Sequence, residues 1–241
     1  VVLIQLRRER QPIVVRDYLK IRPDWPMIGR ILGIGIPSGV ENSMFQLGKL
    51  AIQSTVSTLG TVAIAAQAMT NILENLNGIA GIGVGVGLMT IVGQCMGANR
   101  KDEAVYYIKK LSVIAEVTII VSCLLVFILT RPVTMLGGME KTSADMCWHM
   151  VMWITIVKPI MWVSAFVPAY GLRAAGDVKF SMISSCAVMW LCRFCLSVLL
   201  IRGLGFGPMG VWIGMFADWT VRAVLFTWRF HSRKWLEHKV I

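Results

Sequence analysis

The chain has 241 residues, of which 56% are apolar and 15% are charged, and its mean hydropathy is +0.68. An ordinary soluble domain is about 45–50% apolar and about 25% charged, so this composition excludes one and indicates an integral membrane protein. The same figures exclude intrinsic disorder and a collagen-like chain. Its 24 Lys and Arg against 13 Asp and Glu give a net charge of +11, whose meaning depends on where the charges lie.

Residues 1–27 are predicted to hold the end of a preceding membrane span and then a cytoplasmic linker between two lobes. Residues 7–26 combine dense charge with three prolines, which is typical of a loop. The chain starts with Val rather than Met and contains no signal peptide, so we expect it to begin inside a longer protein. Pro26 suits the first turn of a helix that runs into the first span.

Six later stretches are long and apolar enough to cross a membrane, since a spanning helix needs about 20 apolar residues. They are residues 31–57, 62–94, 111–130, 147–170, 181–201 and 209–229. We therefore predict an all-α integral membrane protein. Residues 28–230 are expected to form a lobe of six transmembrane helices, and residues 231–241 a basic cytoplasmic tail.

The loops differ in charge, and cytoplasmic loops are those that retain Lys and Arg. Seventeen of these residues lie at the two ends and in the second-to-third and fourth-to-fifth loops, whereas the alternate loops hold three. This asymmetry predicts that both ends of the segment are cytoplasmic. It also explains the net charge as membrane topology, so we expect no nucleic-acid partner.

Ionisable residues inside the spans are candidate functional groups, because a charge at mid-bilayer costs at least about 2.5–3.5 kcal/mol and usually faces a cavity or a partner. Glu41 lies ~15 Å inside the first span at 1.5 Å per residue, one turn after Pro37. It is either a functional carboxylate or a merely paired one. Lys158 precedes Pro159 at a similar expected depth, which allows an ion pair with Glu41, a proton-exchanging role or another structural pairing. Asp218 and Arg222 have the i,i+4 spacing of a local ion pair.

A polar stripe runs along the second span. Its members recur at helical spacing and share one face: Gln67, Asn71, Glu74, Asn75 and Gly78. Such a stripe does not face lipid, so it either lines a cavity or hydrogen-bonds to neighbouring helices.

Glycine pairs four residues apart let membrane helices touch. Gly81/Gly85 and Gly210/Gly214 follow this pattern, which indicates tight packing or a helix that flexes. The six cysteines lie mostly in apolar runs, so neither a zinc cluster nor a disulfide framework is expected. Gly97 suits the end of a helix, and Asp102 with Glu103 the start of the next.

Several of these segments together resemble the multidrug and toxic compound extrusion (MATE) family. They are Gln67-Ala68, the glycine run 81–87, Val92-Gly93-Gln94, Gly97-Ala98-Asn99 and the loop LRAAGDVKF at 172–180, which is similar to a recurring Leu-Arg-x-x-Gly-Asp loop through Arg173, Gly176 and Asp177. Six spans with both ends inside also match the carboxy-terminal lobe of that family. The resemblance covers nearly all of residues 28–235.

The resemblance implies a twelve-helix, two-lobe antiporter of which this chain is the carboxy-terminal half. The implied activity is export of amphipathic organic cations and drugs through alternating access, with Na⁺ or H⁺ as the coupling ion and no other cofactor. It also implies location in the cell membrane and two partners besides the substrate: membrane lipid and the missing amino-terminal six-helix lobe.

The same resemblance locates the candidate ion site. The family's usual carboxylate falls two turns beyond the first-span proline, where this chain has Phe45, whereas Glu41 lies one turn earlier. Trp162 stands near the place of a second expected acid, with Lys158 a turn away. We therefore take Glu41 and Lys158 as coupling candidates, with an acid of the amino-terminal lobe as the alternative. Candidates for the substrate cavity are Phe45 and Trp162, together with four residues of the polar stripe: Gln67, Asn71, Glu74 and Asn75.

Two other functions compete with drug export. A related flippase or exporter of lipid-linked oligosaccharides would share the two-lobe plan but carry a more cationic central cavity, suited to anionic headgroups. An intramembrane enzyme would need clustered ligands or a nucleophile with its base. The three histidines, His149, His231 and His238, lie at a span end and in the tail, so we predict no catalytic residue.

Overall fold

The structure, a computed structural model, describes residues 24–237. The predicted linker before residue 24 and the last four residues of the predicted tail lie outside the described residues. The chain divides into two compact units, Val1–Ile36 and Pro37–Ile241. The packing described below is that of the second unit.

The described residues are helical, joined by short connections, and contain no strand, which confirms the all-α prediction. The long helices are α2 (Trp25–Val56), α3 (Thr61–Gly97), α4 (Lys101–Leu136), α5 (Lys141–Ala174) and α8 (Met209–His231). Between α5 and α8 runs one helical rod made of α6 (Val178–Val188), η3 (Met189–Cys195), α7 (Leu196–Val198) and η4 (Leu199–Gly203). The short turns η2 (Ser57–Leu59) and η5 (Lys234–Glu237) complete the order.

Each of the six predicted spans corresponds to one of these helices or to the rod, and the first extends one residue beyond α2. Five of the six are long and apolar enough to cross a membrane: α3, α4, α5, the rod Val178–Gly203, and α8. The helix expected at 31–57 is present as α2, but it is not among the five. Its middle carries Glu41, Asn42, Ser43 and Gln46, which lower its hydropathy.

Two segments of the rod, η3 and η4, are π-helical. Their wider turns, closed by hydrogen bonds between residues five apart, are rare and occur mostly as short insertions in α-helices, often at functional sites. Sequence periodicity does not predict them, because it assumes 3.6 residues per turn.

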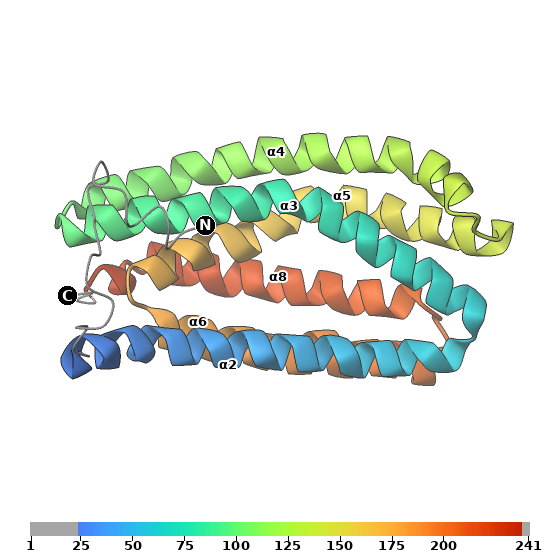
Figure 1. The fold of residues 1–241 in the computed structure, drawn as a ribbon, viewed down its shortest axis with the longest axis horizontal. Helices are drawn as coiled ribbons and strands as arrows, with labels where there is room; N and C mark the ends of the chain where they lie inside the picture. Colours follow the sequence, from blue (N-terminus) through green and yellow to red (C-terminus); the bar gives the residue numbers. More distant parts are fainter. Residues whose placement is uncertain (1–23, 238–241) are drawn as a thin grey trace, which may run out of the picture. The chain divides into compact units, whose positions relative to one another are not determined.

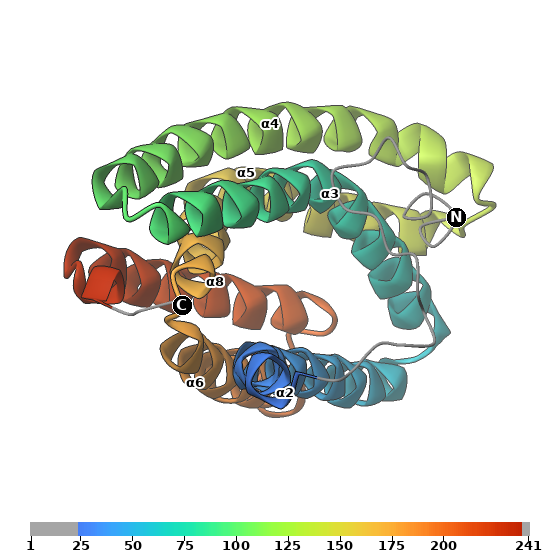
Figure 2. The same cartoon turned by 60° about the vertical axis from the view of Figure 1, so that its left-hand side comes forward.

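Within the second unit, α3, α4 and α5 pack together, and α8 packs on α5 and on the rod, as Figures 1 and 2 show. Residues 37–56 of α2 run beside the rod in both views. A small apolar cluster joins these parts through Ile52 and Val56 of α2, Met189 of η3, Ile201 of η4 and Val211 of α8.

The outer face of α4 is apolar and exposed, as expected of a helix surrounded by lipid. Its exposed residues include Val113, Val117, Val121, Leu124, Leu125 and Ile128. The inner face carries small and apolar residues that belong to the main core, such as Ala115, Ile119 and Cys123. Residues 117–130 of the helix therefore carry no charged side chain and are largely apolar on both faces, which is how membrane helices differ from soluble amphipathic ones.

The predicted helix ends at the loop between α3 and α4 are confirmed. α3 ends at Gly97, and α4 begins at Lys101 with Asp102 and Glu103 in its first turn. Acidic side chains there interact favourably with the positive end of the helix dipole.

Glycines allow α8 to lie directly against the rod. A Cβ on Gly214 would overlap the Ser197 hydroxyl and lie 3.0 Å from the carbonyl oxygen of Arg193. One turn earlier, a Cβ on Gly210 would lie 3.0 Å from Ile201 Cγ1. The Gly210/Gly214 pair is therefore a close-packing contact. On α3, Gly81 and Gly85 face aromatic rings of α5, which gives them the same role.

This contact predicts that Gly214→Ala destabilises the protein, because overpacking a close contact costs about 1–3 kcal/mol. The matched control is Gly93→Ala on α3, where nothing lies within 4 Å of the added Cβ. Thermal unfolding in detergent, followed by tryptophan fluorescence, should show a lower midpoint for Gly214→Ala and an unchanged or higher one for Gly93→Ala. Equal midpoints for the two variants would contradict the packing role.

Candidate functional site

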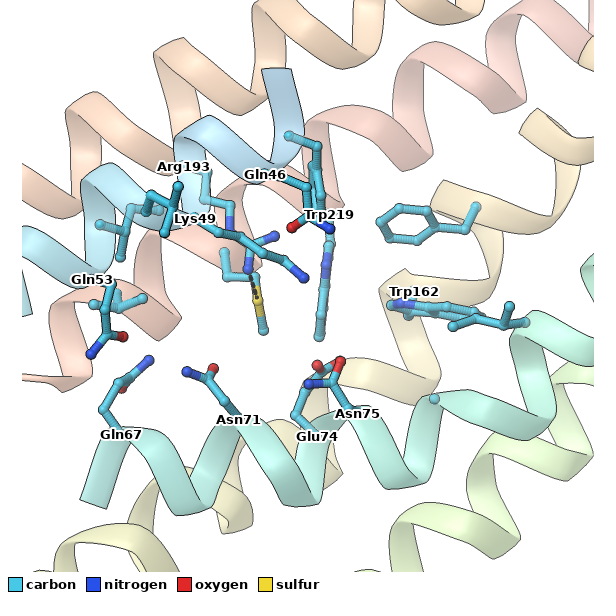
Figure 3. Close-up of a pocket in the computed structure, with 18 of the residues that line it drawn as sticks. Gln46, Lys49, Gln53, Gln67, Asn71, Glu74, Asn75, Trp162, Arg193 and Trp219 are labelled. Atoms are coloured by element: carbon cyan, nitrogen blue, oxygen red, sulfur yellow. Dashed lines mark hydrogen bonds between the residues drawn. The ribbon is translucent and has the colours of Figure 1, made fainter. Parts of the chain in front are cut away.

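A cavity of about 530 Å³ opens between residues of α2, α3, α5, η3 and α8. Figure 3 shows polar side chains of α3 pointing into it from one side and Gln46, Lys49 and Arg193 approaching from the other. Aromatic rings of α5 and α8, including Trp162 and Trp219, line the space beside them. The cavity thus combines an apolar wall with charged and amide groups.

All six residues predicted for a substrate cavity lie in the wall of this one cavity: Phe45, Gln67, Asn71, Glu74, Asn75 and Trp162. Gln67 also accepts a hydrogen bond of 3.0 Å from the indole nitrogen of Trp212 on α8. The polar stripe therefore both lines a cavity and bonds to a neighbouring helix. Whether these residues contact a substrate stays a prediction.

Lys158 is fully buried on α5 and bonds to α3 through its ammonium group. Its Nζ lies 2.7 Å from Glu74 Oε1 and 3.0 Å from the carbonyl oxygen of Glu74, and it also donates to Asn77 Oδ1. Three acceptors satisfy the three N–H donors of an ammonium ion. The rings of Trp162 and Trp219 flank the group, with centroids 5.6 and 6.0 Å away. A charge with this shell is stable away from water.

Glu41 pairs with Arg173 rather than with Lys158, so the suggested Glu41–Lys158 ion pair is wrong. Arg173 lies in the last turn of α5, 15 residues after Lys158, which corresponds to ~22 Å along a helix. The two residues were expected at similar depth because depth was counted from the predicted start of each span. The actual offset of α2 against α5 places them at different levels.

Only one carboxylate oxygen of Glu41 accepts a hydrogen bond from the described residues. Oε1 accepts from Arg173 Nη2, while Oε2 is buried without a hydrogen-bond partner in the described part of the chain. Arg173 also donates from Nε to the hydroxyl of Ser181 on α6, at 2.8 Å. The arginine therefore links α2, the end of α5 and the start of α6.

The rest of the loop motif fixes the chain between α5 and α6. Gly176 has φ = +92°, a conformation that side-chain-bearing residues rarely adopt. Asp177 follows it, is 4% exposed, and accepts a bond of 2.7 Å from Arg229 Nε near the end of α8. The loop motif Arg173, Gly176 and Asp177 thus joins α2, α5, α6 and α8 at one end of the lobe. This is a structural role.

Two cations of the cavity were missed as site residues. Lys49 of α2 lines the cavity, with Nζ 5.0 Å from the centre of the Phe45 ring. Arg193, on η3, is 9% exposed and lies 5.3 Å from the same ring. The spacing of Gln46, Lys49 and Gln53 by three and four residues was a usable signal, since it marks a polar stripe on α2 like the one on α3.

Arg193 differs from the other buried arginine in its partners. Arg222 bonds to Asp218 at 2.9 Å, which confirms the predicted i,i+4 pair, and to the carbonyl oxygen of Ser185 at 2.8 Å. Arg193 donates only to the sulfur of Met215, at 2.9 Å, and its Nε has no hydrogen-bond partner within residues 24–237. No carboxylate of those residues lies within 4.0 Å of it.

All six cysteines are free thiols. Among the residues that the structure describes, no group of three or more His, Cys, Asp or Glu is placed to hold a metal ion.

The lobe is therefore that of a multi-pass membrane protein, with a polar, charged cavity among helices apolar enough to cross a membrane. Residues 37–199 match the MatE family model, and the chain belongs to that family. The family is one of transporters and not of enzymes, in agreement with the sequence prediction.

Curated relatives agree with this assignment over most of the chain. A probable multidrug resistance protein NorM of Thermotoga maritima is 24% identical over 92% of this chain and 47% of its own length. A FAD transporter of Shewanella oneidensis is 29% identical over 80% of this chain and 44% of its own. The chain thus spans about half the length of the curated relatives it matches.

Solved structures show the same fold. A MATE transporter of Vibrio cholerae is 16% identical, with a TM-score of 0.78 over 87% of this chain and 48% of that one. The predicted fold, half of a two-lobe transporter, is consistent with these matches.

The buried Lys158–Glu74 pair yields a stability prediction. Lys158→Met should lower the free energy of unfolding by about 3–5 kcal/mol, because it leaves the Glu74 carboxylate without its partner. The double variant Lys158→Met/Glu74→Gln should recover part of that loss, since it removes the orphaned charge. Thermal and denaturant unfolding of both variants and of Glu74→Gln forms a double-mutant cycle. Strictly additive effects would show that the pair is not coupled.

Proposed function

We propose that the chain is the carboxy-terminal half of a secondary active transporter that exports amphipathic organic molecules across the cell membrane by alternating access. The observation that carries this proposal is the 530 Å³ cavity, whose polar wall lies among membrane-length apolar helices. Transporter sites of this kind form at the interface of two repeats. The proposed partner is an amino-terminal six-helix lobe, and the length of the relatives supports it.

The proposed mechanism is antiport with Na⁺ or H⁺. Ion binding and substrate binding favour opposite-facing states, so each ligand displaces the other, and the difference in affinity between the states drives the cycle. Glu41 is the first candidate for the ion site, because its buried Oε2 is available to a cation or a proton. Lys158, fully buried against Glu74, is the second candidate. Both chain ends of the segment are proposed to be cytoplasmic.

The names of several relatives, which describe them as multidrug resistance proteins, support organic cations and drugs as substrates. A second class is favoured by the cavity itself. Its wall carries Lys49 and Arg193, whereas its one carboxylate, Glu74, is paired with Lys158. A cationic cavity suits anionic substrates such as lipid-linked oligosaccharides, and the relationship to a FAD transporter points in the same direction. Proteoliposome uptake of ethidium against a lipid-linked oligosaccharide separates the two classes.

The coupling role of Glu41 predicts that Glu41→Gln, made in the full-length transporter, abolishes substrate export and leaves membrane expression intact. The substitution keeps the size of the side chain and removes the charge that binds Na⁺ or H⁺. Glu103→Gln is the matched control, because Glu103 is an exposed residue with a surface pair to Arg100 at 3.5 Å. Unchanged efflux in Glu41→Gln cells would remove Glu41 from the ion site and direct attention to the amino-terminal lobe.

A further inference from the structure

The cavity contains two cationic groups around one aromatic ring. Lys49 Nζ and Arg193 Cζ lie 5.0 and 5.3 Å from the centre of the Phe45 ring. Both residues line the cavity, and Figure 3 shows them on its same side. Like charges brought together in a site of low dielectric repel each other, so an anion near both is favoured.

Arg193 forms no ion pair within 4.0 Å with any residue that the structure describes, although it is buried. The residue is 9% exposed, its guanidinium donates to a methionine sulfur, and its Nε has no hydrogen-bond partner among the described residues. Burial of a charge without pairing is costly, and intramembrane charges that face a cavity usually serve function. The other buried cations of the spans, Lys158 and Arg222, each have a carboxylate within 3.0 Å. Of these three buried cations, Arg193 is therefore the one that has no carboxylate partner within 4.0 Å in the described part of the chain.

The backbone around Arg193 is held in place. Its carbonyl oxygen lies where a Cβ on Gly214 would be only 3.0 Å away, so α8 packs directly on this turn of η3. The cation thus sits on a supported part of the rod and not on a loose loop. A fixed, partly desolvated guanidinium binds phosphate or carboxylate better than a mobile one, because little ordering accompanies binding.

We propose that Arg193 and Lys49 form a binding subsite for an anionic group, a phosphate, sulfonate or carboxylate, of an amphipathic molecule whose aromatic or apolar part lies toward Trp162 and Trp219. This inference rests on the proposed function and names its substrate class. The guanidinium supplies the directional donors and the ammonium adds a second positive charge. The aromatic wall supplies apolar contact for the rest of the ligand.

A matched pair of fluorescent probes tests the subsite, because riboflavin 5′-phosphate (FMN) and riboflavin share one ring system and differ by a phosphate. The full-length transporter is reconstituted in nanodiscs of neutral phosphatidylcholine, and dissociation constants follow from flavin fluorescence polarisation. We expect FMN to bind at least about tenfold more tightly than riboflavin, the minimum for a charge-assisted hydrogen bond. Equal affinities of the two probes would overturn the proposal.

Variants assign the preference to the two cations. Arg193→Gln and Lys49→Gln should each bring the ratio of affinities close to one, and Arg193→Lys should retain part of it. Arg202→Gln is the matched control, because Arg202 lies on the same rod but is exposed and outside the cavity. If Arg193→Gln does not fold, the ratio of affinities in Lys49→Gln tests the subsite instead, since Lys49 lies on the cavity surface. A preference for FMN that survives in both Gln variants would overturn the assignment.

Two sources of the anionic group are separated by nanodiscs that contain phosphatidylglycerol. Weaker FMN binding there, in the wild type and Arg202→Gln but not in Arg193→Gln, supports the subsite with a lipid headgroup as competitor. Unchanged binding supports it with a soluble anion. Export assays keep the two proposals apart: ethidium export without FMN preference overturns the subsite alone, whereas FMN preference without export of any substrate overturns the transport function alone.

Discussion

The cost of removing a charge from water governs how these helices are joined. In lipid there is no solvent to satisfy a buried ammonium or guanidinium, so each one requires an acceptor on the same or a neighbouring helix. Lys158 meets this requirement with Glu74 and thereby fixes α5 against α3. Arg173 does so with Glu41 and connects α5 to α2. These two contacts help to set the register of α2, α3 and α5.

Close packing supplies the complementary constraint. The rod and α8 touch through glycines, and glycines of α3 rest on aromatic rings of α5. These contacts draw some faces together and leave the polar stripes of α2 and α3 on either side of a space that no side chain within residues 24–237 fills. The cavity therefore depends on the positions of the glycines, which bring helices together, as much as on the positions of the polar residues that line it. The cavity has an excess of positive charge because its carboxylate, Glu74, is paired with Lys158, whereas Arg193 forms no ion pair among the described residues.

Local patterns in the sequence predicted the features that depend on local physics. The helices, the turn at Gly97, the Asp218–Arg222 pair and the shared face of the polar stripe all follow from hydropathy and from a period of 3.6 residues. The partner of Glu41 did not follow, because the offset between α2 and α5 is set by contacts far apart in sequence. The position of Arg193 in the cavity wall did not follow either, because a period of 3.6 residues does not describe the π-helical turns that precede it.

The π-helical stretch η3 gives the lobe an unusual sensitivity to length. A wide turn is equivalent to one extra residue inserted into an α-helix, and each residue of an α-helix turns the following side chains by about 100°. Loss of a single codon between Met189 and Arg193 would convert the stretch toward an ordinary helix and swing one of its two halves around the axis. We therefore expect a one-residue deletion to change which side chains of η3 face the cavity, and so to change its polarity. Such an evolutionary step requires no substitution of any side chain in the cavity wall.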